Sequence, residues 1–127
     1  MTAFSLGSLL YAYFEDYLKS QKGLRPATVK SYRDAIRLFL NFVAKDLNCK
    51  ITRVSLPELT AARVVRCLST IEVERHNHVR SRNQRLTSLK AFFNYLASRV
   101  PEFVAQAEPV MAIPMKRVPP PSTVFLE

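Results

Sequence analysis

The side chains best suited to chemistry lie in one stretch, from Asn77 to Arg99, which contains neither glycine nor proline. If this stretch is a helix, one of its faces carries side chains that donate hydrogen bonds to phosphates and base edges. That face consists of Asn77, Arg80, Gln84 and Ser88, with Ser81, Arg85 and Thr87 at its flanks. No Asp or Glu occurs from Arg75 to Val100, whereas a merely solvated helix usually mixes both signs of charge. The pattern favours nucleic-acid binding; a basic surface helix without a partner is the alternative.

The other side of the same stretch predicts how this face is held in place. Apolar side chains recur there at helical spacing, as expected of a stripe that faces a hydrophobic core. They are Val79, Leu86, Leu89, Phe93 and Leu96. We therefore predict one long helix, buried on its apolar side, with Asn77 as its candidate N-cap.

Composition points to a polyanionic partner. The 127 residues, a length typical of one domain, carry a formal net charge of +9 and a pI near 10.0. Such an excess favours binding to nucleic acid first and to an anionic membrane surface second. The sequence shows no signal peptide and no run of about 18 apolar residues that could span a membrane. Cys49 and Cys67 are too few for a disulfide scaffold, so we expect a soluble, cytoplasmic protein.

Two helices are predicted in the first part of the chain. The first runs from Ser5 to Lys22 and ends at Gly23. Its apolar residues are Leu6, Leu9, Leu10, Tyr13, Phe14, Tyr17 and Leu18. The second begins at Pro26, which suits the first position of a helix, and runs to about Leu47. Its core stripe is Val29, Tyr32, Ile36, Phe39, Leu40, Val43 and Leu47, and its other sides carry Lys30, Ser31, Arg33, Asp34 and Arg37. Thr28 lies in its first turn, where backbone N–H groups favour a phosphate.

A third helix and a proline-rich tail complete the chain. Ser55 and Glu58 have the spacing of a capping box, which predicts a helix that ends near Ser69. Leu59, Val64, Val65 and Leu68 form its expected buried side, and residues 70–76 cross to the basic helix. Six of the eight prolines lie from position 101 onward. This tail has a possible short helix over residues 102–107 and an extended basic segment at Lys116 and Arg117. The fold class is therefore all-α, with four main helices.

No constellation of residues predicts catalysis or metal binding. Cys49, Cys67, His76 and His78 have spacings that fit no closed zinc site. His76 and His78 are too close in sequence to indicate a nuclease centre, and two glycines cannot form a glycine-rich phosphate loop. We expect no catalytic residue, no metal and no cofactor in this chain.

Three segments resemble a known family. Leu24 to Tyr32 (LRPATVKSY) looks like the start of the second helix in the N-terminal core-binding domain of tyrosine recombinases of the phage-integrase type. Arg85 to Leu96 (RLTSLKAFFNYL) is similar to the last long helix of that domain, and the tail resembles the family's basic interdomain linker.

The resemblance implies a four-helix, SAM-like orthogonal bundle whose second and fourth helices lie at the major groove of a recombination site. It implies a core-binding domain over residues 1–100 and a linker over residues 101–127, toward a separate catalytic domain that cuts DNA. The family's Tyr nucleophile and its Arg, Lys and His partners are not recoverable in this chain, which is therefore expected to be a non-catalytic fragment. Expected partners are duplex DNA and other recombinase protomers, as a tetramer of the full-length protein on nucleoid DNA.

Charge and resemblance select the same two helices as the DNA-binding surface. The candidate contacts are Arg25, Thr28, Lys30, Ser31, Arg33, Arg37, Asn77, Arg80, Ser81, Gln84, Arg85, Thr87, Ser88, Lys116 and Arg117. One alternative is a helical protein-interaction module that docks a partner through Leu38, Phe42 and the aromatic residues of the first helix. Another is a free-standing helix-turn-helix regulator, which needs a shorter turn than residues 70–76 suggest.

Overall fold

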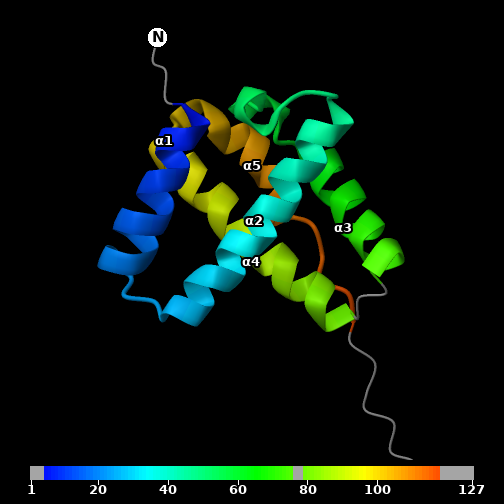
Figure 1. The fold of residues 1–127 in the computed structure, drawn as a ribbon, viewed down its shortest axis with the longest axis horizontal. Helices are drawn as coiled ribbons and strands as arrows, with labels where there is room; N and C mark the ends of the chain where they lie inside the picture. Colours follow the sequence, from blue (N-terminus) through cyan, green and yellow to red (C-terminus); the bar gives the residue numbers. More distant parts are fainter. Residues whose placement is uncertain (1–4, 76–78, 118–127) are drawn as a thin grey trace, which may run out of the picture.

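Two long helices, α2 (Pro26–Asp46) and α4 (Val79–Arg99), cross near the middle of the molecule, and the other helices are arranged around them (Figure 1). The structure is a computed structural model that describes residues 5–75 and 79–117. The remaining elements are α1 (Leu6–Tyr11), the π-helix η1 (Ala12–Gln21), the 3₁₀ turns η2 (Ile51–Arg53), η3 (Leu56–Glu58) and η4 (Pro101–Phe103), and the helices α3 (Ala61–Arg75) and α5 (Val104–Met111). These described residues contain no strand, and the prediction of an all-α fold is confirmed.

The N-terminal helix begins and ends where the sequence predicts. Ser8 donates its backbone N–H to the Ser5 hydroxyl at 3.1 Å, which caps α1. Gly23 has a φ of +61°, a conformation that glycine adopts without steric conflict. The segment Ala12–Gln21 winds in wider π turns, which the apolar spacing did not predict. All seven predicted apolar residues belong to the core or pack against it.

α2 also follows its predicted boundaries and core stripe. Pro26 stands in its first turn, where the missing N–H costs no hydrogen bond. The predicted stripe is buried at Val29, Ile36, Phe39, Leu40 and Val43 and half-buried at Tyr32 and Leu47.

The capping box closes a short turn instead of starting the third helix. Ser55 donates its backbone N–H to the Glu58 carboxylate at 2.8 Å, around η3. Leu59 then adopts an extended conformation (φ −88°, ψ 91°), which interrupts the helix and buries its side chain completely. Arg63 donates its N–H to the Thr60 hydroxyl at 3.2 Å, at the start of α3. The predicted start of this helix was therefore wrong, because the capping box is satisfied within a single turn.

The end of α3 also differs from the prediction. The helix continues to Arg75, past the expected end near Ser69, and Ile71 packs against the core. Residues 70–75, expected to form a crossing segment, are helical. Val65, predicted to be buried, is 44% exposed. The predicted N-cap Asn77 lies outside the described residues.

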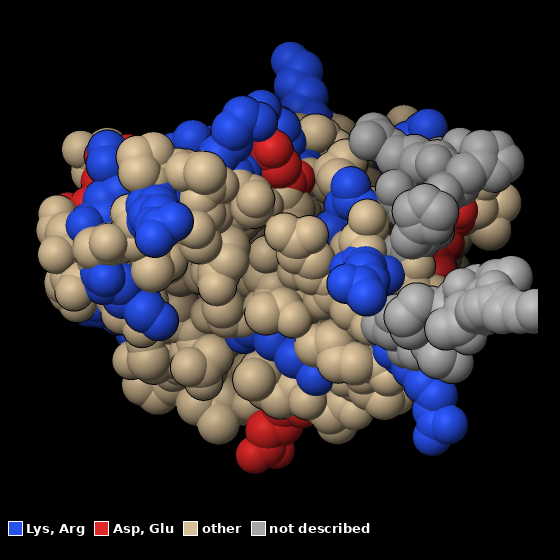
Figure 2. Space-filling view, turned by 90° about the horizontal axis from the view of Figure 1, so that it is seen from below, with Lys and Arg blue, Asp and Glu red and all other residues tan. Residues whose placement is uncertain are grey.

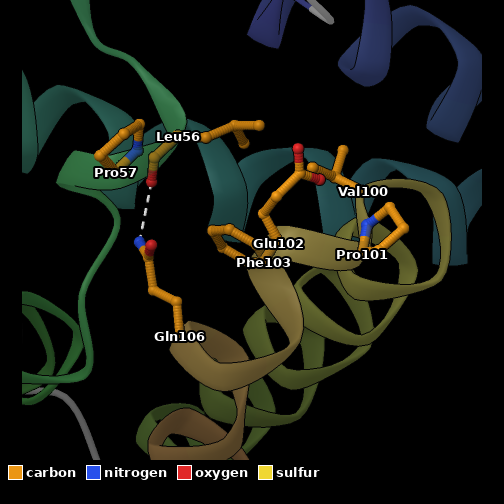
Figure 3. Close-up of a pocket in the computed structure, with 7 residues that line it drawn as sticks. All are labelled: Leu56, Pro57, Val100, Pro101, Glu102, Phe103 and Gln106. Atoms are coloured by element: carbon orange, nitrogen blue, oxygen red, sulfur yellow. Dashed lines mark hydrogen bonds between the residues drawn. The ribbon is translucent and has the colours of Figure 1, made fainter. Parts of the chain in front are cut away.

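The chain after Val100 belongs to the helical body as far as Ile113. Phe103, Ala107, Val110 and Ile113 are buried in the same core as α2 and α4, beyond the boundary that the sequence suggested. Gln106 reaches across from α5 and donates its side-chain amide to the Leu56 carbonyl at 2.8 Å (Figure 3) and to the Leu59 carbonyl at 2.5 Å. These contacts attach α5 to the turn that precedes α3.

Aromatic side chains connect the elements around α4. Phe93 is fully buried and contacts Phe39 of α2 and Phe103 of η4, with ring centroids at 6.0 and 5.5 Å. Tyr13 packs its ring against Tyr95 at 4.8 Å. Its hydroxyl is buried without a hydrogen-bond partner. Burial, together with the neighbouring tyrosines, raises the pKa of Tyr13 well above its ordinary value.

We predict that Phe93→Ala destabilises the fold by about 3–5 kcal/mol, because it removes buried apolar surface and leaves a cavity between three elements. The matched control is Asn94→Ala, one residue along on the exposed side of α4, which should cost less than about 1 kcal/mol. Denaturant unfolding measures both variants, and costs in the reverse order would contradict this packing.

Candidate nucleic-acid interface

The N-terminal halves of α2 and α4 lie in the same half of the molecule and approach each other toward the point where the helices cross (Figure 1). Both helices begin at the lower end in the view of Figure 1. A cleft of about 150 Å³ lies between them, and we call it the α2–α4 cleft. It is lined by Ser31, Asp34, Ala35, Ser81, Gln84, Arg85 and Ser88. The structure therefore places candidate residues of both helices side by side.

Exposed side chains border this cleft on both helices. On α4 they are Arg80, Gln84 and Thr87, and on α2 they are Lys30, Asp34 and Arg37. Residues spaced by three or four positions are neighbours on a helix surface, so each set forms one stripe beside the cleft. We call the cleft and its two stripes the α2–α4 face. Ser31, Arg33, Ser81 and Arg85 are half-buried.

The charge on this end of the molecule is mainly positive. Figure 2, which views the molecule from below, shows Lys and Arg distributed across the surface and Asp and Glu in only a few places. Arg25 is exposed immediately before α2, and Thr28 is half-buried in its first turn. The N-terminal ends of helices add partial positive charge from unpaired backbone N–H groups.

Ser88 does not lie on the exposed polar side of α4, as the sequence had suggested. It is 2% exposed and donates its hydroxyl to the Gln84 carbonyl at 3.2 Å. Ser88 and the buried Ala35 of α2 line the same cleft, so two small side chains face each other where the helices approach. The prediction of an exposed Ser88 was wrong because this side of α4 is covered by α2.

Some candidate cations already have partners within the protein. Lys30 pairs with Asp34 at 3.0 Å, and the Arg33 guanidinium lies 5.3 Å from the centre of the Phe14 ring. Lys116 pairs with Glu72 at 2.9 Å. Such exposed ion pairs contribute about 0–1 kcal/mol each, so a phosphate could compete for these cations.

Three residues that matter for this end of the molecule were not among the candidates. Asp34 brings a carboxylate to the cleft, which its spacing of four residues from Lys30 could have indicated. Arg82 and Asn83 hold the part of the tail that follows α5, through hydrogen bonds to Pro114 and Lys116. No local pattern could have identified these two, because their partners lie more than 30 residues away.

Two hollows in the surface lie away from this face. They have volumes of about 780 and 700 Å³ and share Leu56 and Pro57 in their linings. Each contains a single charged residue, Arg53 in one and Glu102 in the other (Figure 3). Neither hollow presents the converging polar groups of a typical catalytic pocket.

The described residues show no cluster of three or more metal-ligating side chains. His76 and His78 lie outside the described residues. Cys49 is exposed and Cys67 is buried. Burial raises the pKa of the Cys67 thiol to about 12, against a smaller opposite effect of Arg85, so this thiol is neutral at pH 7. Within the described ranges, none of the helices is long and apolar enough to cross a bilayer.

Comparison with known proteins gives two similar relatives, both from Sinorhizobium fredii (strain NBRC 101917 / NGR234). The chain is 40% identical over 113 residues to "Putative integrase/recombinase y4rC" and 37% identical over 112 residues to "Putative integrase/recombinase y4rD". These alignments cover 89% and 88% of this chain but only 34% and 40% of the relatives. The chain thus spans less than half the length of either relative. No solved structure matches the chain.

The family model described as "Phage integrase, N-terminal SAM-like domain" matches residues 12–100. The matched range includes both α2 and α4. This match and the two relatives confirm the resemblance found in the sequence. The chain belongs to the family of phage-integrase N-terminal SAM-like domains.

Proposed function

We propose that this chain binds duplex DNA through the α2–α4 face, as the non-catalytic N-terminal arm of a site-specific recombinase. The composition of α4 is the main support for this proposal. The helix exposes Arg80, Gln84 and Thr87 and contains no acidic residue along its length. A helix of this kind presents donors to a polyanion and no carboxylate that would repel it.

Contacts to the DNA backbone position the domain. Arg25 and Arg37 are exposed at or near the α2–α4 face, where they can neutralise phosphates. Thr28 lies in the first turn of α2, where the positive end of the helix dipole favours an anion. These contacts supply affinity without sequence preference.

Contacts to base edges supply sequence preference. Gln84 can pair bidentately with adenine and Arg80 with guanine in the major groove. Asp34 is an acceptor across the cleft from Gln84, and an Asp carboxylate accepts a hydrogen bond from cytosine N4. The α2–α4 face thus combines donors and one acceptor.

The catalytic step belongs to another domain in this proposal. Family membership and the short coverage of the two integrase/recombinase relatives support a parent protein that carries its strand-cutting residues elsewhere. Protomers of that parent assemble on a recombination site in the nucleoid, as a tetramer, and this chain contributes their DNA-binding arms.

A protein-docking module is the second candidate. A groove of about 400 Å³ between α2 and α3 is lined by half-buried Leu38, Phe42 and Ile71, which favours an apolar partner. The Arg66 guanidinium lies 5.4 Å from the centre of the Phe42 ring, however, and Arg66 also pairs with Asp46. A charged side chain thus stands beside the groove's largest apolar residue.

The length of the connection between α3 and α4 does not exclude a free-standing helix-turn-helix regulator. Only residues 76–78 separate α3 from α4, fewer than the sequence predicted. The recombinase arm is favoured instead by the family match, which extends over η1, α2, α3 and α4 and not over one helix pair.

We predict that binding to duplex DNA weakens steeply with salt. With about five phosphates contacted, log K should fall against log salt with a slope of roughly −4 to −5. Arg37→Ala, on the α2 stripe, should reduce the slope by about 1, whereas Arg53→Ala, the same loss of charge at η2, should leave it unchanged. Fluorescence anisotropy at several salt concentrations measures these slopes. A flat salt response of the wild type would contradict DNA binding through phosphates.

We predict that sequence preference resides in α4. Gln84→Ala and Arg80→Ala should each reduce discrimination between a cognate and a random duplex by about 1–3 kcal/mol. Arg117→Ala, in the extended tail, should weaken both complexes equally, because the tail reaches only backbone or minor groove. Selection of bound sequences from a random pool supplies the cognate duplex. The assignment of sequence preference to α4 would be wrong if Arg117→Ala changed the ratio of cognate to random affinity while both α4 variants left that ratio unchanged.

A further inference from the structure

The first turns of α4 hold the C-terminal tail just after the helical body, at residues 114–116, by a reciprocal pair of hydrogen bonds. Asn83 accepts the backbone N–H of Lys116 on its side-chain oxygen at 2.9 Å. The same amide donates its Nδ2 group to the Lys116 carbonyl at 2.8 Å. One side chain thus satisfies both backbone polar groups of one residue, as a neighbouring β-strand would.

Two more side chains fix this arrangement. Arg82 is 9% exposed and donates its guanidinium to the Pro114 carbonyl at 3.0 Å and to the Asn83 side-chain oxygen at 3.1 Å. Glu72, from the last part of α3, pairs with the ammonium group of Lys116 at 2.9 Å. Three side chains from two helices therefore converge on residues 114–116, which we call the tail clamp.

The tail clamp lies next to the residues that the proposed function uses. Asn83 neighbours Gln84 in sequence and is three positions from Arg80, so all three lie on adjoining turns of α4. Lys116 is fixed against Asn83, and the next residue, Arg117, is exposed. The backbone that enters Arg117 is therefore held beside α4, and its exposed side chain is within reach of the α4 stripe of the α2–α4 face.

We propose that Arg82 and Asn83 are positioning residues, which hold the tail so that Arg117 contacts duplex DNA as part of the α2–α4 face. Binding is favoured because the tail is already ordered before DNA arrives, and less conformational entropy is lost on contact. Lys116 serves as the anchor, with its ammonium group held by Glu72. This inference rests on the proposed DNA-binding function.

Hydrogen exchange tests the tail clamp without DNA. In the wild type, the Lys116 amide should exchange roughly tenfold more slowly than in an unstructured chain. Asn83→Ala should remove this protection, whereas Asn94→Ala, which deletes the same amide group on the exposed side of α4, should retain it. Unprotected Lys116 in the wild type, or protection that survives Asn83→Ala, would overturn the clamp. If Asn83→Ala does not fold, Glu72→Gln provides a second variant and should speed exchange of the same amide.

A double-mutant cycle tests the positioning role. Asn83→Ala should weaken duplex DNA binding by roughly 2- to 10-fold, and Asn94→Ala should leave it unchanged. In an Arg117→Ala background, Asn83→Ala should have no further effect, because the cation that it positions is gone. An effect of equal size in both backgrounds, or no effect in either, would overturn the positioning role.

Failure of this inference differs from failure of the proposed function. If the wild type does not bind duplex DNA at low salt, both the proposed function and the role of Arg117 are wrong. The hydrogen-exchange data would still show whether the tail clamp exists. If the wild type binds and the cycle shows no coupling, DNA binding stands and the positioning role alone is wrong.

Discussion

The crossing of α2 over α4 shapes both the core and the candidate interface. Phe39 and Phe93 fill its interior, with ring centroids 6.0 Å apart, while Ala35 and Ser88 meet at the α2–α4 cleft. Large side chains on one side and small ones on the other set how closely two helices approach. The same packing that forms the core therefore brings two polar stripes side by side on the surface.

The distribution of acidic side chains leaves this surface basic. Asp46, at the far end of α2, interacts with Arg63 and Arg66, and the hydrogen bond from Arg63 is the main reason that its pKa is lowered. Glu72 is occupied by Lys116. Among the described residues that line or border the cleft, Asp34 is the only carboxylate. The residues that line or border the cleft therefore carry Lys30, Arg37, Arg80 and Arg85 against this single carboxylate.

The sequence predicted those features that depend on local patterns. Apolar spacing located the four main helices, and Gly23 and Pro26 marked the end of one and the start of the next, because turn and cap chemistry acts within a few residues. The capping box at Ser55 gave the wrong start for the third helix, because the backbone is extended at Leu59, whose side chain is buried in the core. Ser88 was misplaced because a serine can enter an interior if its hydroxyl donates to a carbonyl of the preceding turn. The tail clamp was invisible, since it joins residues more than 30 positions apart.

Nuclear magnetic resonance can test whether duplex DNA lies on the α2–α4 face. The backbone amide signals of the labelled chain would be followed during titration with a short duplex at low salt. Shifts should concentrate at Ser31, Asp34, Ser81 and Gln84, with signals near Gln106 and in the α2–α3 groove unchanged. Shifts confined to the α2–α3 groove, with the residues of the α2–α4 cleft unaffected, would contradict DNA binding through the α2–α4 face.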